Sequence, residues 1–130
     1  MDCDMLIKMA SKAMKNAYVP YSNFKVGAAL LTKAGKVYTG CNVENASYGA
    51  TICAERTAIF KAVSEGEREF EAIAITADSD EFAYPCGICR QVMLEFSKDL
   101  KIYISNKNGE YKEYTISELL PTGFTKDNMR

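Results

Sequence analysis

The sequence predicts an α/β protein, a three-layer α-β-α sandwich with a mixed five-stranded sheet. Two observations lead to this fold class. Helical and strand-like patterns follow one another in the order α-β-β-α-β-α-β-β-α, which is typical of a sheet with helices on both faces. The length of 130 residues suits one hydrophobic core and is too short for two. We therefore expect a single domain over residues 1–130.

The first half of the chain is expected to hold two helices and a hairpin. Apolar side chains recur at helical spacing over residues 2–18. Residues 25–32 and 36–43 have strand character, and Ala34-Gly35 suits the turn between them. Residues 53–64 are predicted to form the second helix, with its apolar side chains facing inward.

The second half continues the alternation. Residues 71–77 form a short, mostly apolar segment, which is expected of a strand buried on both faces. A helix should follow Pro85, with an apolar stripe on one side. Residues 101–106 and 111–114 are predicted strands, and residues 116–120 a final short helix. Both segments that carry candidate metal ligands then lie at strand-to-helix junctions, where such sheets place their ligands.

Charge and hydropathy narrow the class of partner. The net charge is −1, from 16 basic and 17 acidic residues spread along the chain. A nucleic-acid-binding protein would show a basic stripe, so we expect a small-molecule ligand and no nucleic acid. No run of about 18 apolar residues is present, so no membrane span is expected. The first residues lack the pattern of a secretory signal, which favours a cytoplasmic protein.

The absence of histidine is the most informative count. It excludes Ser-His-Asp and Cys-His catalysis, histidine general bases and histidine-ligated metal sites. Any catalysis must therefore use a carboxylate, a thiolate, a lysine, a tyrosine or a metal ion. The five cysteines fit this conclusion, because a reducing compartment disfavours disulfides and clustered thiols there indicate metal binding or a reactive thiol.

Three short features carry the candidate chemistry: Cys53-Ala54-Glu55, Pro85-Cys86 and Cys89. Cys86 and Cys89 are three residues apart, so at the start of a helix their thiols can share one ion, and Cys53 can supply a third soft ligand. Zinc prefers such donors, and three protein ligands leave a fourth position for water. Cys53 and Glu55 can approach the same water only if the metal lies beyond the N-terminal end of their helix.

The charge of such a site needs compensation. A site of Zn²⁺ and three thiolates has a net charge of −1. This negative charge makes the metal a weaker Lewis acid and raises the pKa of its bound water, whereas catalytic zinc needs a bound water with a pKa of about 7. Helix dipoles and a nearby cation can offset that excess. We infer that Arg56 donates a hydrogen bond to a ligand sulfur. Without a metal, Arg56 would be an ordinary solvated helix residue.

These motifs resemble the Cys/Cys/Cys version of the cytidine deaminase signature. The resemblance rests on CAERTA at 53–58 and PCGICRQ at 85–91, and it extends over YVPYSNFKVGAALL at 18–31, GCNVENASYG at 40–49 and ELLPTGF at 118–124. The sequence is similar to the small homotetrameric cytidine deaminases. The resemblance implies zinc-dependent hydrolysis of cytidine and 2'-deoxycytidine to uridine and 2'-deoxyuridine, with release of ammonia, in pyrimidine salvage.

The resemblance also implies roles for individual residues. Cys53, Cys86 and Cys89 bind one zinc ion per subunit, Glu55 shuttles protons, and Arg56 compensates charge. Phe24 packs against the pyrimidine ring, and Ala54 belongs to the substrate site. Asn42 and Glu44 hydrogen-bond the sugar 3'-hydroxyl. Active sites are shared between subunits of the homotetramer, and the residues contributed by neighbouring subunits are Ala46, Tyr48 and Phe124.

Other interpretations stay open at this point. A CxxC pair alone is more often a structural zinc or redox pair, and Cys3 or Cys41 could complete a structural Cys₄ site. The small deaminases of guanidino-nucleoside antibiotics share the length, the zinc ligands and the tail motif, although NVEN at 42–45 favours a free cytidine. Deaminases of nucleotides and nucleic acids usually place histidine as the first ligand, which this sequence cannot do. Considered one at a time, Cys3 is expected near a frayed terminus and Cys41 in a strand.

Overall fold

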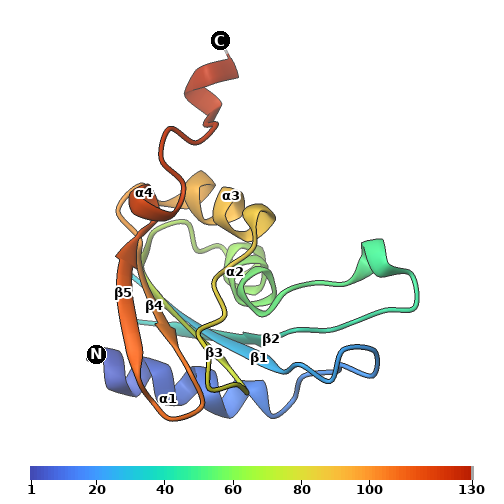
Figure 1. Cartoon of the computed structure of the whole chain (residues 1–130). Helices are drawn as coiled ribbons and strands as arrows, with labels where there is room; N and C mark the ends of the chain where they lie inside the picture. The colour runs from blue at the N-terminus through green and yellow to red at the C-terminus, as the bar shows by residue number, and fades with distance from the viewer. Residues whose placement is uncertain (130) are drawn as a thin grey trace.

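The protein is described by a computed structural model that covers residues 1–129. Within that range the strands form one sheet in the order β2-β1-β3-β4-β5 (Figure 1). The strands are β1 (Val26–Thr32), β2 (Val37–Cys41), β3 (Phe70–Ala77), β4 (Lys101–Ser105) and β5 (Tyr111–Thr115). The helices are α1 (Cys3–Met14), α2 (Ala54–Ser64), α3 (Gly87–Phe96) and α4 (Ile116–Leu119), with short 3-10 helices η1 (Tyr48–Ala50) and η2 (Lys126–Met129).

The directions of the strands decide where the helices begin. β1 is antiparallel to both β2 and β3, so β2 and β3 run the same way, and β4 is parallel to β3. α2 follows β2 along the chain and α3 follows β3. The N-termini of α2 and α3 therefore lie at the same edge of the sheet, the edge where such folds place their sites. The predicted mixed five-stranded sheet is confirmed.

Alternate side chains along the strands pack into two separate hydrophobic cores, because successive residues of a strand point to opposite faces of the sheet. Leu30, Ile73 and Ile102 belong to the core under α2 and α3, whereas Ala29 and Ala74 belong to the core under α1. Figure 1 shows α1 below the sheet and α2 and α3 above it. This confirms the three-layer α-β-α arrangement. As expected, β3 is buried on both faces over most of its length.

The first helix begins where the sequence predicts and ends early. Asp2 caps it by accepting a hydrogen bond from the Met5 amide. The Cys3 thiol, in the first turn, donates a hydrogen bond to the Tyr111 hydroxyl at 3.2 Å. The helix ends at Met14 rather than near residue 18. The reason is that the Tyr18 amide donates to the Asn42 carbonyl, which draws residues 15–18 into a bridge with the segment after β2.

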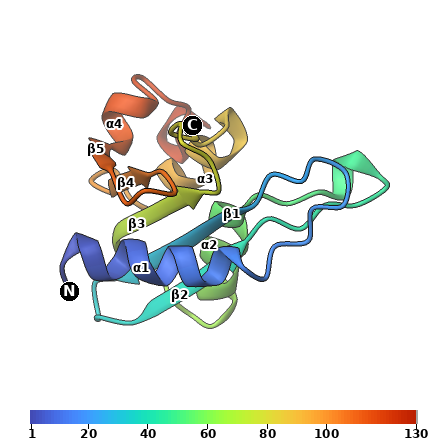
Figure 2. The same ribbon diagram turned by 60° about the horizontal axis from the view of Figure 1, so that its bottom comes forward.

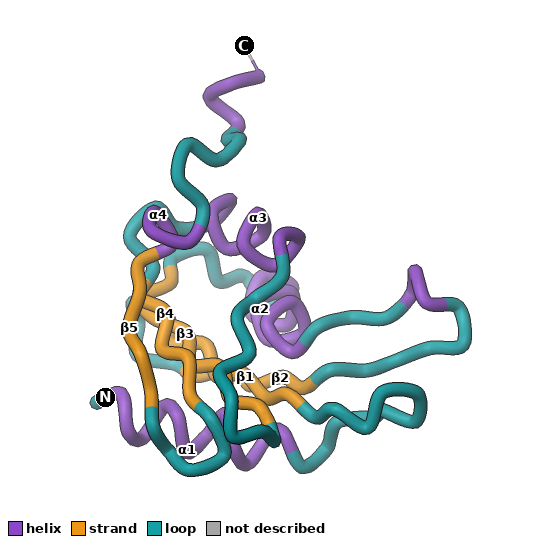
Figure 3. The backbone as a smooth tube through the Cα atoms, viewed as in Figure 1, coloured by secondary structure: helices purple, strands orange, loops and turns teal. Residues whose placement is uncertain are grey.

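That bridge starts a projection formed by two loops that extend side by side from the sheet (Figures 2 and 3). One loop joins α1 to β1, and the other joins β2 to α2 and carries η1. The helices η1 and η2 were not predicted from the sequence, because each is a single turn without an apolar periodicity. Within residues 1–129, every helix falls short of the length and apolarity needed to cross a bilayer.

Candidate active site

The three predicted cysteines meet at the shared edge of α2 and α3. Cys53 is the N-cap residue of α2 and Cys86 the N-cap residue of α3, while Cys89 lies in the first turn of α3. Their Sγ atoms all lie within 4.8 Å of one another, and those of Cys53 and Cys86 are 3.9 Å apart. Neither N-cap side chain accepts a capping hydrogen bond from a backbone amide of its own helix.

The donor set fits zinc. A tetrahedral site with Zn–S bonds of about 2.3 Å places its sulfurs about 3.8 Å apart, close to the 3.9 Å between Cys53 and Cys86. Among residues 1–129 the cluster contains these three cysteines and no further Cys, Asp or Glu. Cys3 and Cys41 are outside it, so the four-cysteine structural site lacks its fourth sulfur. Three protein ligands with an open position characterise catalytic zinc.

Hydrogen bonds and charge shape the metal-free cluster. Contacts from the Cys89 thiol and from Arg56 lower the pKa of Cys53 to about 5. Arg56 Nη2 donates to Cys53 Sγ at 3.4 Å. Sharing a proton with Cys53, together with burial, raises the pKa of Cys89. Arg56 Nε is buried without a hydrogen-bond partner among the described residues, whereas its Nη2 contacts sulfur. A positive charge therefore stands beside the thiolate cluster.

Glu55 lies in the first turn of α2, two residues after Cys53. Its side chain is 4% exposed, and it lines the same pocket as Cys53 and Cys86. Burial raises the pKa of this carboxyl to about 7 in the metal-free protein. The carboxyl is thus held beside the cysteine cluster without belonging to it. The geometry agrees with a cluster that lies beyond the N-terminal end of the helix.

The pocket over the cysteines has a volume of about 210 Å³. Its lining includes three residues expected at a substrate site, namely Phe24, Asn42 and Ala54. Asn42 Oδ1 accepts from the Val26 amide at 3.0 Å, and Asn42 Nδ2 donates to the Phe24 carbonyl at 2.8 Å. The Asn42 amide therefore fixes the backbone on either side of residue 25 and so holds Phe24 against the pocket.

Glu44 lies in a neighbouring hollow of about 380 Å³, formed by the two loops of the projection. Its carboxylate accepts hydrogen bonds from the Tyr21 and Ser22 amides at 3.0 and 3.2 Å and from the Ser22 hydroxyl at 2.5 Å. The Ser22 hydroxyl bond is the main reason that the pKa of Glu44 is lowered. Within this single chain, Asn42 and Glu44 thus line adjacent hollows rather than one.

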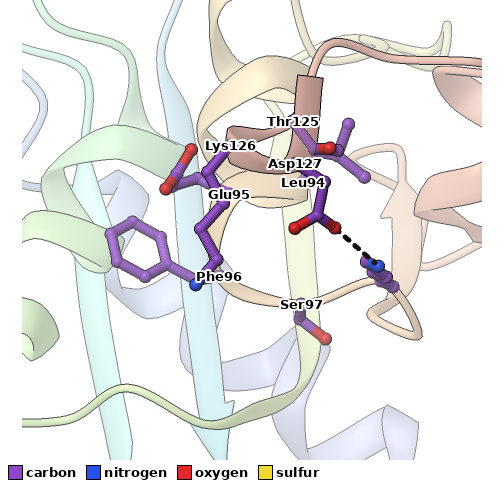
Figure 4. Close-up of a pocket in the computed structure, with 8 residues that line it drawn as sticks. Leu94, Glu95, Phe96, Ser97, Thr125, Lys126 and Asp127 are labelled. Atoms are coloured by element: carbon purple, nitrogen blue, oxygen red, sulfur yellow. Dashed lines mark ion pairs between the residues drawn. The ribbon is translucent and has the colours of Figure 1, made fainter. Parts of the chain in front are cut away.

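Three expected site residues lie outside the pocket over the cysteines, although Tyr48 lines the hollow that holds Glu44. Ala46 and Tyr48 belong to the projection, and Tyr48 is 75% exposed. Phe124 is also exposed, in the C-terminal segment, where its carbonyl accepts from Gln91 Nε2 at 2.7 Å. That segment also covers a cavity of about 200 Å³ against the end of α3 (Figure 4). An ion pair of 3.7 Å between Lys98 and Asp127 crosses it, and it lacks any of the residues expected at the site.

Sequence reasoning missed several residues that build the site. Val26 and Ile75 line the pocket from β1 and β3, and Ala83 and Tyr84 line it from the loop before Cys86. Arg90 holds that loop, because its Nε donates to the Pro85 carbonyl at 2.8 Å and its Nη1 to the Leu119 carbonyl at 2.8 Å. For Ala83 and Tyr84 the sequence did offer a signal, namely their position just before Cys86. Residues that precede a metal ligand lie close to its site whatever their type.

Comparison with known proteins gives a consistent picture. Residues 2–105 match the family described as the cytidine and deoxycytidylate deaminase zinc-binding region. The chain is 58% identical over 130 residues to a cytidine deaminase of Halalkalibacterium halodurans, covering 99% of this chain and 98% of that protein. A crystal structure of cytidine deaminase from Burkholderia pseudomallei superposes with a TM-score of 0.92 at 50% identity, covering 95% of this chain and all of that one. A blasticidin-S deaminase of Bacillus cereus is more distant, at 32% identity over 130 residues, covering 94% of this chain and 91% of that protein.

Proposed function

This chain belongs to the cytidine and deoxycytidylate deaminase family, and from that premise we propose that it hydrolyses cytidine and 2'-deoxycytidine to uridine and 2'-deoxyuridine. Water replaces the amino group of the pyrimidine, the C–N bond breaks, and ammonia leaves. One observation carries the proposal: three thiols lie within 4.8 Å of one another, and two of them, Cys53 and Cys86, line a pocket together with the buried carboxyl of Glu55.

Cys53, Cys86 and Cys89 would hold one zinc ion, with Arg56 offsetting the negative charge of their thiolates. Bound zinc supplies a Lewis acid that brings the pKa of a bound water to about 7. The N-termini of α2 and α3 contribute further positive potential, because Cys53 and Cys86 cap these two helices.

Glu55 is the proton carrier of the proposed reaction. It is buried, lines the pocket and is not one of the clustered ligands, so its carboxylate is free to accept and return protons. It takes one proton from the attacking water and passes it to the ring nitrogen. It then takes the second proton from the hydroxyl now bonded to the amine-bearing carbon and gives it to the departing amine, so that the carbonyl of the product forms as ammonia leaves. Assistance of this kind is typically worth about 10²–10⁴-fold in rate.

The pocket offers apolar surface to the faces of a flat ring. Phe24 and Val26 offer apolar surface, and Ala54 presents a small side chain next to Cys53. The proposed partners of the sugar 3'-hydroxyl are Asn42 and Glu44, which sit in adjacent hollows on the same loop. Both already make hydrogen bonds within the chain, so sugar binding requires Glu44 to share its acceptor oxygens with Ser22.

The assembly and setting of the enzyme are also proposed. We expect a homotetramer in which Ala46, Tyr48 and Phe124 reach the sites of neighbouring subunits. Their position outside their own pocket, with Tyr48 and Phe124 exposed, supports this arrangement. A role in pyrimidine salvage in the cytoplasm follows from the proposed nucleoside substrate and is compatible with a net charge of −1.

The deciding experiment follows the conversion of cytidine to uridine by ultraviolet absorbance. Purified protein should turn over cytidine, lose activity in a zinc chelator and regain it when zinc is restored. Turnover of blasticidin S by the same preparation, with none of cytidine, would replace the proposed substrate by the antibiotic class. Zinc-loaded protein that converts neither substrate would remove the enzymatic proposal.

A further inference from the structure

The loop between β3 and α3 runs from the end of β3 to the start of α3 (Figure 3). Its residues Ala83 and Tyr84 line one wall of the pocket shortly before Cys86. Three consecutive residues of this loop, Phe82, Ala83 and Tyr84, have different surroundings. Phe82 and Tyr84 both contact β5, and Ala83 and Tyr84 both line the pocket. Tyr84 is held at β5 through its ring and its hydroxyl. A larger side chain at residue 83 is therefore the change that would narrow the pocket at this wall.

Two contacts with β5 flank Ala83. Lys112 Nζ lies 4.8 Å from the centre of the Phe82 ring, in a cation–π contact. The Tyr84 and Tyr114 hydroxyls are 3.1 Å apart, and their rings pack edge to face with centroids 5.8 Å apart. Lys112 and Tyr114 are two residues apart on β5 and so share a face of that strand.

The β4–β5 hairpin also fixes the start of the loop. Asn106 Nδ2 donates to the Asp80 carbonyl at 2.9 Å, and the Lys107 amide donates to the Ser79 carbonyl at 2.9 Å. Arg90 holds the other end at the Pro85 carbonyl. The loop is held at both ends, and the residues on either side of Ala83 contact β5. We therefore expect the loop to move little when a bulky ligand binds, so the size of the residue 83 side chain determines the space in the pocket at this wall.

We infer that Ala83 is a specificity-determining residue, which limits the bulk of substituents on the reacting edge of the pyrimidine. The inference rests on the proposed function, which places the amine-bearing carbon near the three cysteines. Ala83 and Cys86 line the same pocket. With the amine-bearing carbon at the cysteines, we expect this wall to face the 4-amino group and the neighbouring 5-position of the base. A methyl side chain at residue 83 leaves room there that a larger side chain would fill.

The test compares Ala83→Val and Ala83→Leu with the unaltered enzyme on three substrates: cytidine, 5-methylcytidine and cytidine methylated on its 4-amino group. Hydrolysis of the last releases methylamine instead of ammonia and gives uridine. One methylene in an apolar pocket changes kcat/KM by about 10–200-fold. For at least one methylated substrate, the ratio of its kcat/KM to that of cytidine should fall about tenfold or more in the variants. Unchanged ratios for both methylated substrates would overturn the inference.

Two further variants separate selectivity from general damage. Ala13→Val is the control, because Ala13 lies in α1 on the other face of the sheet. This variant should leave both ratios unchanged. Tyr114→Phe changes a residue outside the lining and removes the hydroxyl partner of Tyr84, which lines the pocket, so it should raise the same ratio by loosening the wall. Zinc content and thermal unfolding verify that each variant folds. Failure of the unaltered enzyme on cytidine would count against the proposed function, whereas equal ratios in an active enzyme would count against Ala83 alone.

Discussion

The sulfur atoms of Cys53 and Cys86 lie 3.9 Å apart although 33 residues separate them in the chain. Each caps a helix that follows one of two strands running in the same direction, so the topology of the sheet brings them together. Cys89 completes the cluster from the first turn of the second helix. The site is therefore a property of the fold, and its weak points are the contacts that fix the two helix starts.

Replacement of Cys86 by serine should remove the metal. Serine lacks the soft sulfur that zinc prefers, and two remaining thiolates bind zinc much more weakly than three. Metal analysis of purified protein should show about one zinc per chain before the change and a small fraction of that after it. Cys41→Ser is the matched control, because Cys41 lies in β2 outside the cluster and should keep its zinc.

Replacement of Glu55 by glutamine should separate catalysis from metal binding. The amide has nearly the shape of the carboxylate but cannot carry protons, so kcat for cytidine should fall by about 10²–10⁴-fold. Zinc content should stay unchanged, since Glu55 is not among the clustered ligands. The matched control is Glu69→Gln, at an exposed glutamate, and this variant should retain full activity. Near-normal turnover by Glu55→Gln would refute the proton-carrier role.

The fold could be predicted well because its strong patterns are local. The apolar segment at residues 71–77 corresponds to β3, and the predicted helix at 53–64 is α2 with Cys53 as its cap. The early end of α1 could not be predicted, because it depends on the bridge between Tyr18 and Val43, a contact between distant segments. Local periodicity carries no information about such a partner.

The candidate site could be predicted where residue type decides the chemistry. Thiols and carboxylates at the spacing of Cys53, Glu55 and Cys86 have few alternative uses. Residues whose role depends on packing gave no such signal: Ala83 is an ordinary alanine until the structure places it in the pocket. The internal hydrogen bonds of Asn42 likewise depend on the neighbouring strand, and no residue type reveals them.

Replacement of Arg90 by glutamine should weaken zinc binding without removing a ligand. Its guanidinium joins the Pro85 carbonyl, next to Cys86, to the Leu119 carbonyl at the end of α4. Loss of a residue that orients a ligand typically costs about 10–100-fold in metal affinity, which competition with a chromophoric chelator can measure. Arg68→Gln is the matched control, since Arg68 also donates to backbone carbonyls, those of Val63 and Glu67, but away from the site. Equal zinc affinities for both variants would contradict a positioning role for Arg90.

A methyl group added at Gly40 should disturb the site from beneath. A Cβ there would lie 2.6 Å from the Ala54 carbonyl oxygen and 2.6 Å from the Ala58 amide nitrogen, both backbone atoms of α2. The helix must move away from β2, and overpacking of this kind typically costs about 1–3 kcal/mol in the free energy of unfolding. Because Ala54 directly follows Cys53, the same shift should also lower kcat for cytidine. Urea unfolding tests the first effect, with Gly49→Ala as its control: nothing lies within 4 Å of that Cβ, so its stability should change by less than about 0.5 kcal/mol. If Gly40→Ala were as stable and as active as the unaltered protein, the close packing of α2 on β2 would not be what positions Cys53 and Glu55.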